Sequence, residues 1–125
     1  MFEDFPYNHA EEAPTRKRFS EMENIEIRKE NFYSVTTKTM FDITMCDILI
    51  VDIGNMRKTY EFFIKDIYPH LKHGSLSILE GGSIERDNYY KSKGYSNESI
   101  NEFLQSCSVP YCILSSFPSI TLFSR

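Results

Sequence analysis

An α/β fold with a mostly parallel sheet is the fold class that this 125-residue sequence predicts. The prediction depends on residues 47–55 and 75–82, two short apolar strands that each end in an acidic residue and glycine. Between them, residues 56–72 repeat apolar side chains at helical spacing, and Gly74 follows as a helix-ending residue. Strand, helix and strand in this order form a parallel βαβ unit. Ligands of open α/β sheets bind at the carboxyl ends of the strands, so we expect the function at this edge.

The first of these strands, residues 47–53, carries apolar side chains on both faces. Ile48 and Ile50 alternate with Leu49 and Val51. This pattern is typical of a strand that is covered on both sides, as in the middle of a parallel sheet. The helix that follows contains Pro69, which we expect to kink its last turn because proline lacks an amide hydrogen.

The remaining segments predict shorter elements around this unit. Only Ser116-Phe-Pro separates the two last strands, residues 111–115 and 119–123, so they are expected to form an antiparallel hairpin. The other expected elements are a charged helix over residues 10–22, a short strand over Ile25–Lys29, a short helix or irregular crossover over 33–46, a loop with at most a turn of helix over 83–96, and a helix that begins at Ser96 or Asn97.

The composition fits one folded domain over residues 1–125 and excludes several classes of function. Acidic and basic residues are interspersed and the net charge is -4, so no nucleic-acid partner is expected. No apolar run approaches the roughly 18 residues that span a bilayer, and the chain begins with acidic residues where a signal peptide would be basic. We therefore expect a cytoplasmic protein without a membrane partner. The three cysteines and three histidines lack metal-ligand spacing, which predicts no metal site.

The order of these segments resembles a known sheet. Class I S-adenosylmethionine-dependent methyltransferases have seven strands, the last of which is inserted antiparallel beside the fifth. This sequence is similar to the C-terminal two-thirds of that fold, with residues 47–55 as the fourth strand and 75–82 as the fifth. Small-molecule methyltransferases of sugar and polysaccharide biosynthesis likewise carry the pattern of Leu79–Ser83 followed by Glu85–Asp87. The resemblance implies a truncated Rossmann-like methyltransferase sheet, mostly parallel with a C-terminal antiparallel hairpin.

The sequence departs from this family where the family binds its cofactor. It contains no G-x-G, so the glycine-rich loop after the first strand has no counterpart, and the N-terminal part of the domain is expected to be incomplete. If S-adenosylmethionine binds, the resemblance assigns its ribose to Glu3 or Asp4. It assigns its adenine to Asn31, whose side-chain carbonyl can accept a hydrogen bond from the amine.

The two strand ends supply the candidate catalytic residues. The resemblance places Asp52 near the transferred methyl group and, with Gly54, near the cofactor. Alternatively, Asp52 caps the following turn and Gly54 serves that turn alone. Glu80 can orient a substrate hydroxyl or act as a general base, or it can bind nearby backbone amides. Gly81 and Gly82 imply a positive φ or the close approach of another group.

Three further residues are candidates for substrate binding. Glu85 and Arg86 lie in the segment after the second strand, where an arginine can clamp a carboxylate or phosphate. A surface ion pair with its neighbours is the alternative for Arg86. His9 lies in a polar segment that matches the similar sequences.

These features give two main hypotheses for function. The first is methyl transfer from S-adenosylmethionine to a hydroxyl or amine of a small-molecule acceptor, with Asp52 or Glu80 as base. The second is a non-catalytic remnant or interaction module that has lost the cofactor. A dinucleotide-binding domain is disfavoured because its glycine fingerprint is absent. Without a first strand beside it, the strand at 47–53 is an apolar edge, which predicts either repair by the Ile25–Lys29 strand or a homodimer.

Overall fold

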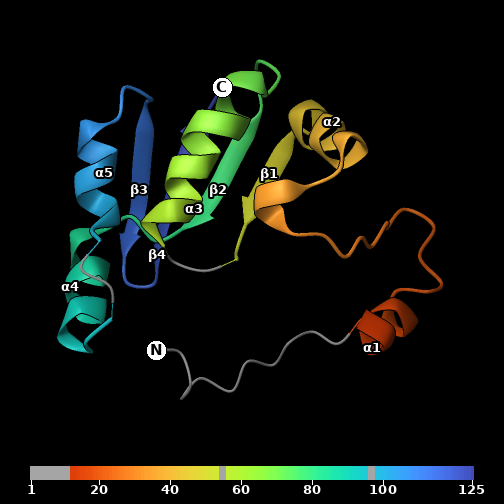
Figure 1. Cartoon of the computed structure of the whole chain (residues 1–125), viewed down its shortest axis with the longest axis horizontal. Coiled ribbons are helices and arrows are strands. Elements are labelled where there is room, and N and C mark those ends of the chain that lie inside the picture. Colours follow the sequence, from red (N-terminus) through yellow and green to blue (C-terminus); the bar gives the residue numbers. More distant parts are fainter. Residues whose placement is uncertain (1–11, 54–55, 96–97) are drawn as a thin grey trace. The chain divides into compact units, whose positions relative to one another are not determined.

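The computed structural model describes residues 12–53, 56–95 and 98–125 (Figure 1). The chain divides into two compact units, Met1–Thr36 and Thr37–Arg125, which we describe separately. Helix α1 (Glu12–Arg18) and the 3-10 turn η1 (Phe32–Ser34) belong to the first unit. The second unit contains every strand among the described residues.

The first unit is held by surface charges and a few turns. Arg16 pairs with Glu12 one helical turn away, with Nε 3.0 Å from Oε1, and no residue of α1 is buried. The strand predicted over Ile25–Lys29 is wrong, because these residues form no strand. Arg28 instead pairs with Glu26 two residues before it. The segment alternates as a strand would, but apolar alternation alone does not form a strand without a neighbour to pair with.

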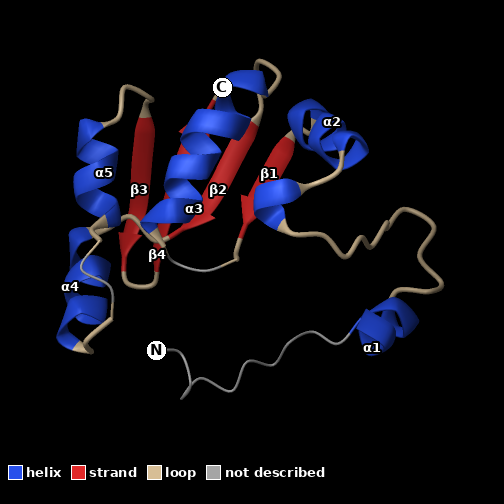
Figure 2. Ribbon diagram, viewed as in Figure 1, coloured by secondary structure: helices blue, strands red, loops and turns tan. Residues whose placement is uncertain are grey.

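The second unit is built on a four-stranded sheet (Figure 2). Its strands lie in the order β1-β2-β4-β3, where β1 is Ile48–Val51, β2 is Leu76–Glu80, β3 is Tyr111–Ser116 and β4 is Ser119–Ser124. The parallel pairing of β1 with β2 confirms the predicted βαβ unit. The hairpin of β3 and β4 is also confirmed, and β4 is antiparallel to both of its neighbours.

The crossover between β1 and β2 changes its winding along its length. It begins as α3 (Arg57–Phe62), widens to the π-helical segment η2 (Phe63–Ile67) and tightens to the 3-10 turn η3 (Tyr68–His70). Pro69 lies in this last turn, and at Leu71 the backbone is already extended. The expected kink is therefore an end of the helix, because proline cannot donate the next helical hydrogen bond. The prediction that Gly74 ends the helix is wrong, because the last turn already ends at His70 with Leu71 as its cap; Gly74, with φ +87°, lies in the turn before β2.

The hydrophobic core lies between this crossover and one face of the sheet. Phe63 and Ile67 are fully buried, and the Phe63 ring lies 5.0 Å from that of Phe123 on β4. Figure 1 shows α3 and α5 (Ile100–Ser106) across this face. The alternate residues of β1 and β2, Val51 and Leu79, point into the same core.

The opposite face of the sheet corrects a prediction. We expected β1 to be covered on both sides, but Ile48 and Ile50 are 59% and 68% exposed. Leu114 on β3 is also exposed. The described residues of the second unit leave these side chains uncovered. The apolar pattern of β1 therefore predicts its place in the sheet correctly and its burial incorrectly.

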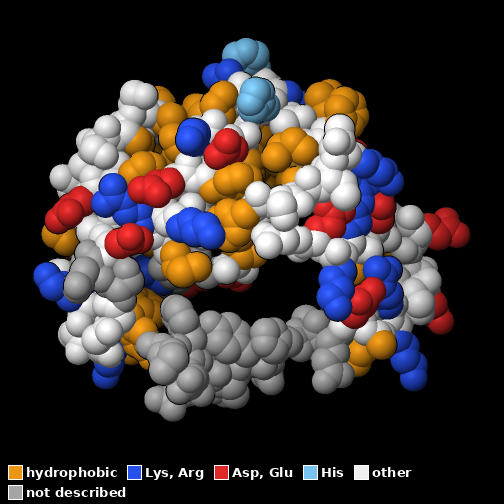
Figure 3. Space-filling view, viewed as in Figure 1, with side chains coloured by type: hydrophobic (Ala, Val, Ile, Leu, Met, Phe, Trp, Pro, Cys, Tyr) orange, Lys and Arg blue, Asp and Glu red, His pale blue; other side chains and the backbone are white. Residues whose placement is uncertain are grey.

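The helices after each strand also differ from expectation. Residues 84–92 were predicted as a loop with at most one turn of helix, but they form the nine-residue helix α4 (Ile84–Ser92). The cap of α5 is Ser99 rather than the predicted Ser96 or Asn97, which lie outside the described residues. Helix α2 (Thr37–Met45) confirms a short helix within 33–46. Figure 3 shows apolar side chains at the surface over α2, where Phe41 and Met45 are exposed.

Candidate functional site

The carboxyl ends of β1, β2 and β3 meet at one edge of the sheet. β3 runs antiparallel to β4, which runs antiparallel to β2, so β3 points the same way as β1 and β2 (Figure 2). This edge carries Asp52 after β1, Glu80 at the end of β2, and Ser115 and Ser116 at the end of β3. It is the edge at which open α/β sheets bind ligands.

Asp52 and Glu80 occupy neighbouring positions at this edge. Val51 is paired with Leu79, so the next residue of each strand is Asp52 and Glu80, about one strand spacing of 4.8 Å apart. Asp52 is exposed, and the described residues offer it no hydrogen bond. Glu80 is half-buried and belongs to the paired part of β2. The structure thus places the two residues predicted as catalytic at neighbouring strand ends.

Gly81 and Gly82 serve a tightly packed turn after β2. Both have positive φ, +97° and +107°, as the sequence predicted. A Cβ on Gly82 would lie 2.1 Å from Oγ1 of Thr121, so the predicted close approach is confirmed and the approaching group is the side chain of β4. The Thr121 hydroxyl donates to the Gly81 carbonyl oxygen at 2.7 Å. The paired glycines therefore have a structural cause within the protein.

Tyr60 on α3 fixes the end of β2 from the core side. Its hydroxyl donates to the backbone carbonyl oxygen of Glu80 at 2.8 Å, and its side chain is 1% exposed. Burial raises the pKa of Tyr60 above its ordinary value. This residue was not among the predicted site residues, although its helical spacing placed it in the core.

Arg86 is buried, which excludes the surface ion pair considered from the sequence. Only 3% of the residue is exposed, and its guanidinium lies 4.2 Å from the centroid of the Tyr90 ring one turn further along α4. Among the described residues, Nη2 has no hydrogen-bond partner. Burial lowers the pKa of Arg86, because the charged form loses its hydration. The guanidinium is thus buried, with one nitrogen that no described residue pairs.

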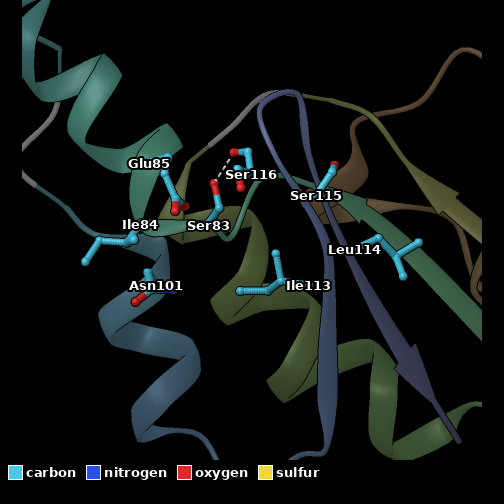
Figure 4. Close-up of a pocket in the computed structure, with 8 residues that line it drawn as sticks. All are labelled: Ser83, Ile84, Glu85, Asn101, Ile113, Leu114, Ser115 and Ser116. Atoms are coloured by element: carbon cyan, nitrogen blue, oxygen red, sulfur yellow. Dashed lines mark hydrogen bonds between the residues drawn. The ribbon is translucent and has the colours of Figure 1, made fainter.

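Glu85 faces a separate pocket beside this turn (Figure 4). The pocket has a volume of about 270 Å³ and lies between the starts of α4 and α5 and the end of β3. Its lining consists of Ser83, Ile84, Glu85, Asn101, Ile113, Leu114, Ser115 and Ser116. Glu85 is thus the charged residue of the lining. The sequence identified Glu85 as a substrate-binding candidate but gave no indication of the pocket.

A hydrogen-bond network joins the walls of this pocket and was not predicted. Asn101 donates through Nδ2 to the Gly82 carbonyl oxygen at 2.9 Å. The Asp87 carboxylate accepts from the Asn101 amide at 2.8 Å and from the Ser99 hydroxyl at 2.7 Å. Ser83 caps α4 by accepting from the Arg86 amide, and its hydroxyl donates to the Ser116 carbonyl oxygen. Ser83, followed by Glu85 and Asp87, was the sequence signal that could have predicted α4.

Of the residues predicted to bind the cofactor, the structure describes Asn31 and Asp52. Asp4, His9 and Gly54 lie outside the described residues. Asn31 belongs to the first unit, and its side-chain oxygen already accepts a hydrogen bond from the Tyr33 amide at 2.9 Å. Asp52 lies at the carboxyl edge of the sheet in the second unit, where it is the one predicted cofactor contact among the described residues.

Comparison with protein-family models, curated proteins and solved structures finds no match to this chain. Over the ranges that the structure describes, no helix is both long enough and apolar enough to cross a membrane. The same ranges contain no group of three or more His, Cys, Asp or Glu side chains placed to hold a metal ion. What the chain does must therefore be argued from the sheet edge itself.

Proposed function

We propose that this chain is a methyltransferase-like domain that binds the small-molecule acceptor in methyl transfer from S-adenosylmethionine. The observation that supports the proposal is the sheet order β1-β2-β4-β3, with the last strand antiparallel beside β2 and two carboxylates at the neighbouring ends of β1 and β2. This is the order that the resemblance implies for the fourth, fifth, seventh and sixth strands.

In this proposal, the residues at and after the end of β2 bind the acceptor and remove its proton. Glu80 is the proposed base that takes the proton of an acceptor hydroxyl or amine, with Asp52 on the next strand as the alternative. Arg86 is proposed to bind a negatively charged group of the acceptor through its unpaired Nη2. Orientation of the acceptor is the main contribution expected of the protein. S-adenosylmethionine would supply the methyl group.

Calorimetric titration with S-adenosylhomocysteine tests the proposal directly. We expect heat of binding with a dissociation constant at or below about 1 mM, and weaker binding by Asp52→Asn. Glu102→Asn, which removes an exposed carboxylate on α5, is the matched control and should bind as the original chain does. Absence of heat at millimolar ligand would overturn the proposal for this chain.

A second candidate function is an interaction module that pairs with another copy of itself. Large apolar side chains are exposed along α2 and β1: Phe41, Met45, Ile48, Ile50 and Ile53. β1 is also an edge strand of the sheet, with a hydrogen-bonding side that faces away from β2. Two such edges related by a two-fold axis would pair antiparallel into one continuous sheet, in which Ile48 and Ile50 lie beside their counterparts of the second copy.

Molar mass by light scattering distinguishes this candidate. The original chain should have the mass of two copies at micromolar concentration, and Ile50→Lys should shift it toward one. Leu114→Lys places the same charge on the exposed face of β3, at the opposite edge, and should leave the mass unchanged. A mass of one chain for all three proteins would exclude the dimer.

A further inference from the structure

The pocket at the start of α4 is lined by a single charged side chain, and that charge is negative. Glu85 is its one charged residue, and neither Lys nor Arg lines it. Arg86, the next residue, faces the core on the other side of the helix. A ligand in this pocket therefore meets one negative charge and no positive side chain in the lining.

The Glu85 carboxylate is also available. Within the described ranges it forms neither a hydrogen bond nor an ion pair, and it is exposed at the pocket. Three other polar side chains of the wall are already engaged, since Ser83 bonds to the Ser116 carbonyl oxygen and the Arg86 amide, Ser115 donates to the Pro118 carbonyl oxygen, and Asn101 bonds to Gly82. The Ser116 hydroxyl is neutral, so Glu85 supplies the only charge in the lining.

The rest of the pocket is apolar. Ile84 on α4 is 55% exposed, and Ile113 and Leu114 of β3 complete this part of the lining (Figure 4). Pockets that combine apolar walls with a few polar groups are typical of small-molecule sites. The volume of about 270 Å³ limits the ligand to a small molecule.

The aromatic residues next to the lining favour a cation. Tyr89 lies one helical turn after Glu85, and its ring packs 4.9 Å from that of Phe117, the residue after Ser116. Both rings are about half exposed, 44% and 56%. The Tyr89 ring already attracts an ammonium group of the chain, because Nζ of Lys93 lies 5.7 Å from its centroid.

We propose that this pocket binds a small organic amine in its ammonium form, with the ammonium group on Glu85 and the carbon skeleton against Ile84 and Ile113. The proposal does not depend on methyl transfer, because no residue of the β1 end and no cofactor takes part. The site is open and the carboxylate is exposed, so the affinity for a small amine is expected to be on the order of 1–10 mM.

A set of ligands with one carbon skeleton tests the charge preference. n-Butylamine, 1-butanol and butyrate are titrated into the full chain at neutral pH and low salt, while backbone amide resonances are followed by NMR. We expect n-butylamine to shift the resonances of Ser83, Glu85 and Ser116, 1-butanol to act more weakly, and butyrate to have no effect. An alcohol that binds as well as the amine, a preference for butyrate, or no shifts with any ligand would each overturn the proposal.

Two variants tie the effect to one carboxylate. Glu85→Gln should weaken n-butylamine binding by about threefold to fivefold and remove the difference between amine and alcohol. Glu102→Gln is the matched control, because Glu102 is an exposed carboxylate in the first turn of α5 and lies outside the pocket lining. The control should bind as the original chain does. Unchanged amine binding by Glu85→Gln, with its amide spectrum still that of a folded protein, would contradict the assignment.

Discussion

The chain leaves β1 and β2 at the same edge of the sheet with similar residues, yet the two exits are built differently. After β2, Gly81 and Gly82 are buried, and their carbonyl oxygens accept hydrogen bonds from Thr121 and Asn101. After β1, Asp52 and Ile53 are exposed. An acidic residue followed by glycine therefore identifies a strand end but does not indicate how tightly that end is packed.

The largest expected effect is at the packed exit. Gly82→Ala should lower the free energy of unfolding by more than about 3 kcal/mol, because the new methyl group meets Thr121 and the backbone has positive φ. Gly74→Ala is the matched control: its φ is also positive, but nothing lies within 4 Å of the added Cβ, so the cost should be near 1 kcal/mol. Denaturant unfolding measures both, and equal losses would show that the close approach costs nothing.

Tyr60 offers a test of the same exit through pH. Because burial raises its pKa, the unfolded chain releases the Tyr60 proton near pH ~10 while the folded chain keeps it. This contribution to stability is complete below that pH and is lost as the pH rises above it, with a slope of about 1.4 kcal/mol per pH unit. Tyr60→Phe should lack the extra slope and lose about 1 kcal/mol at neutral pH with the hydrogen bond to Glu80. Unfolding curves between pH 9 and 11 that run parallel for both proteins would contradict the prediction.

Replacement of Arg86 should stabilise the protein, whereas the changes at Gly82 and Tyr60 should destabilise it. Its charge is buried and no carboxylate pairs with it in the described part of the chain, so Arg86→Met is expected to raise the free energy of unfolding by about 1 kcal/mol while filling the same space. Thermal unfolding gives the sign. A loss of more than 1 kcal/mol would mean that the stacking on Tyr90 outweighs the cost of burying the charge.

The smallest effect is expected at the open exit. Asp52→Asn should change the free energy of unfolding by less than about 0.5 kcal/mol, because the side chain is exposed and makes no hydrogen bond within the described ranges. If chemical denaturation shows that the variant loses more than 1 kcal/mol of unfolding free energy, Asp52 caps the turn after β1. The segments after β1 and β2 would then both be held by hydrogen bonds.

The sequence predicted the strands and their pairing better than the helices around the sheet and the burial of its faces. The βαβ unit and the final hairpin follow from local signals, namely apolar strands, helical spacing and a three-residue connection. The predicted burial of β1 on both faces was wrong. Apolar residues on both faces of a strand favour burial, but they do not show whether another element of the fold lies over each face. Helix α4 was missed because its tyrosines and charges have no helical apolar period, and its cap at Ser83 is its main local signal.

The candidate site was predicted only where it follows the strand ends. Asp52 and Glu80 could be placed from the sequence, since the carboxyl ends of parallel strands meet at one edge. The pocket at Glu85 depends on Asn101, Ser115 and Ser116, which come from distant parts of the chain. No spacing along the sequence predicts such a meeting, because it arises from tertiary packing.

The position of β4 has a consequence for synthesis. This strand lies between β2 and β3, yet it is made after both of them. A nascent chain that has reached Ser116 therefore holds β2 with one neighbour and β3 with none. The sheet can become continuous only after residues 119–124 have left the ribosome, and until then one edge of β2 and both edges of β3 have no partner.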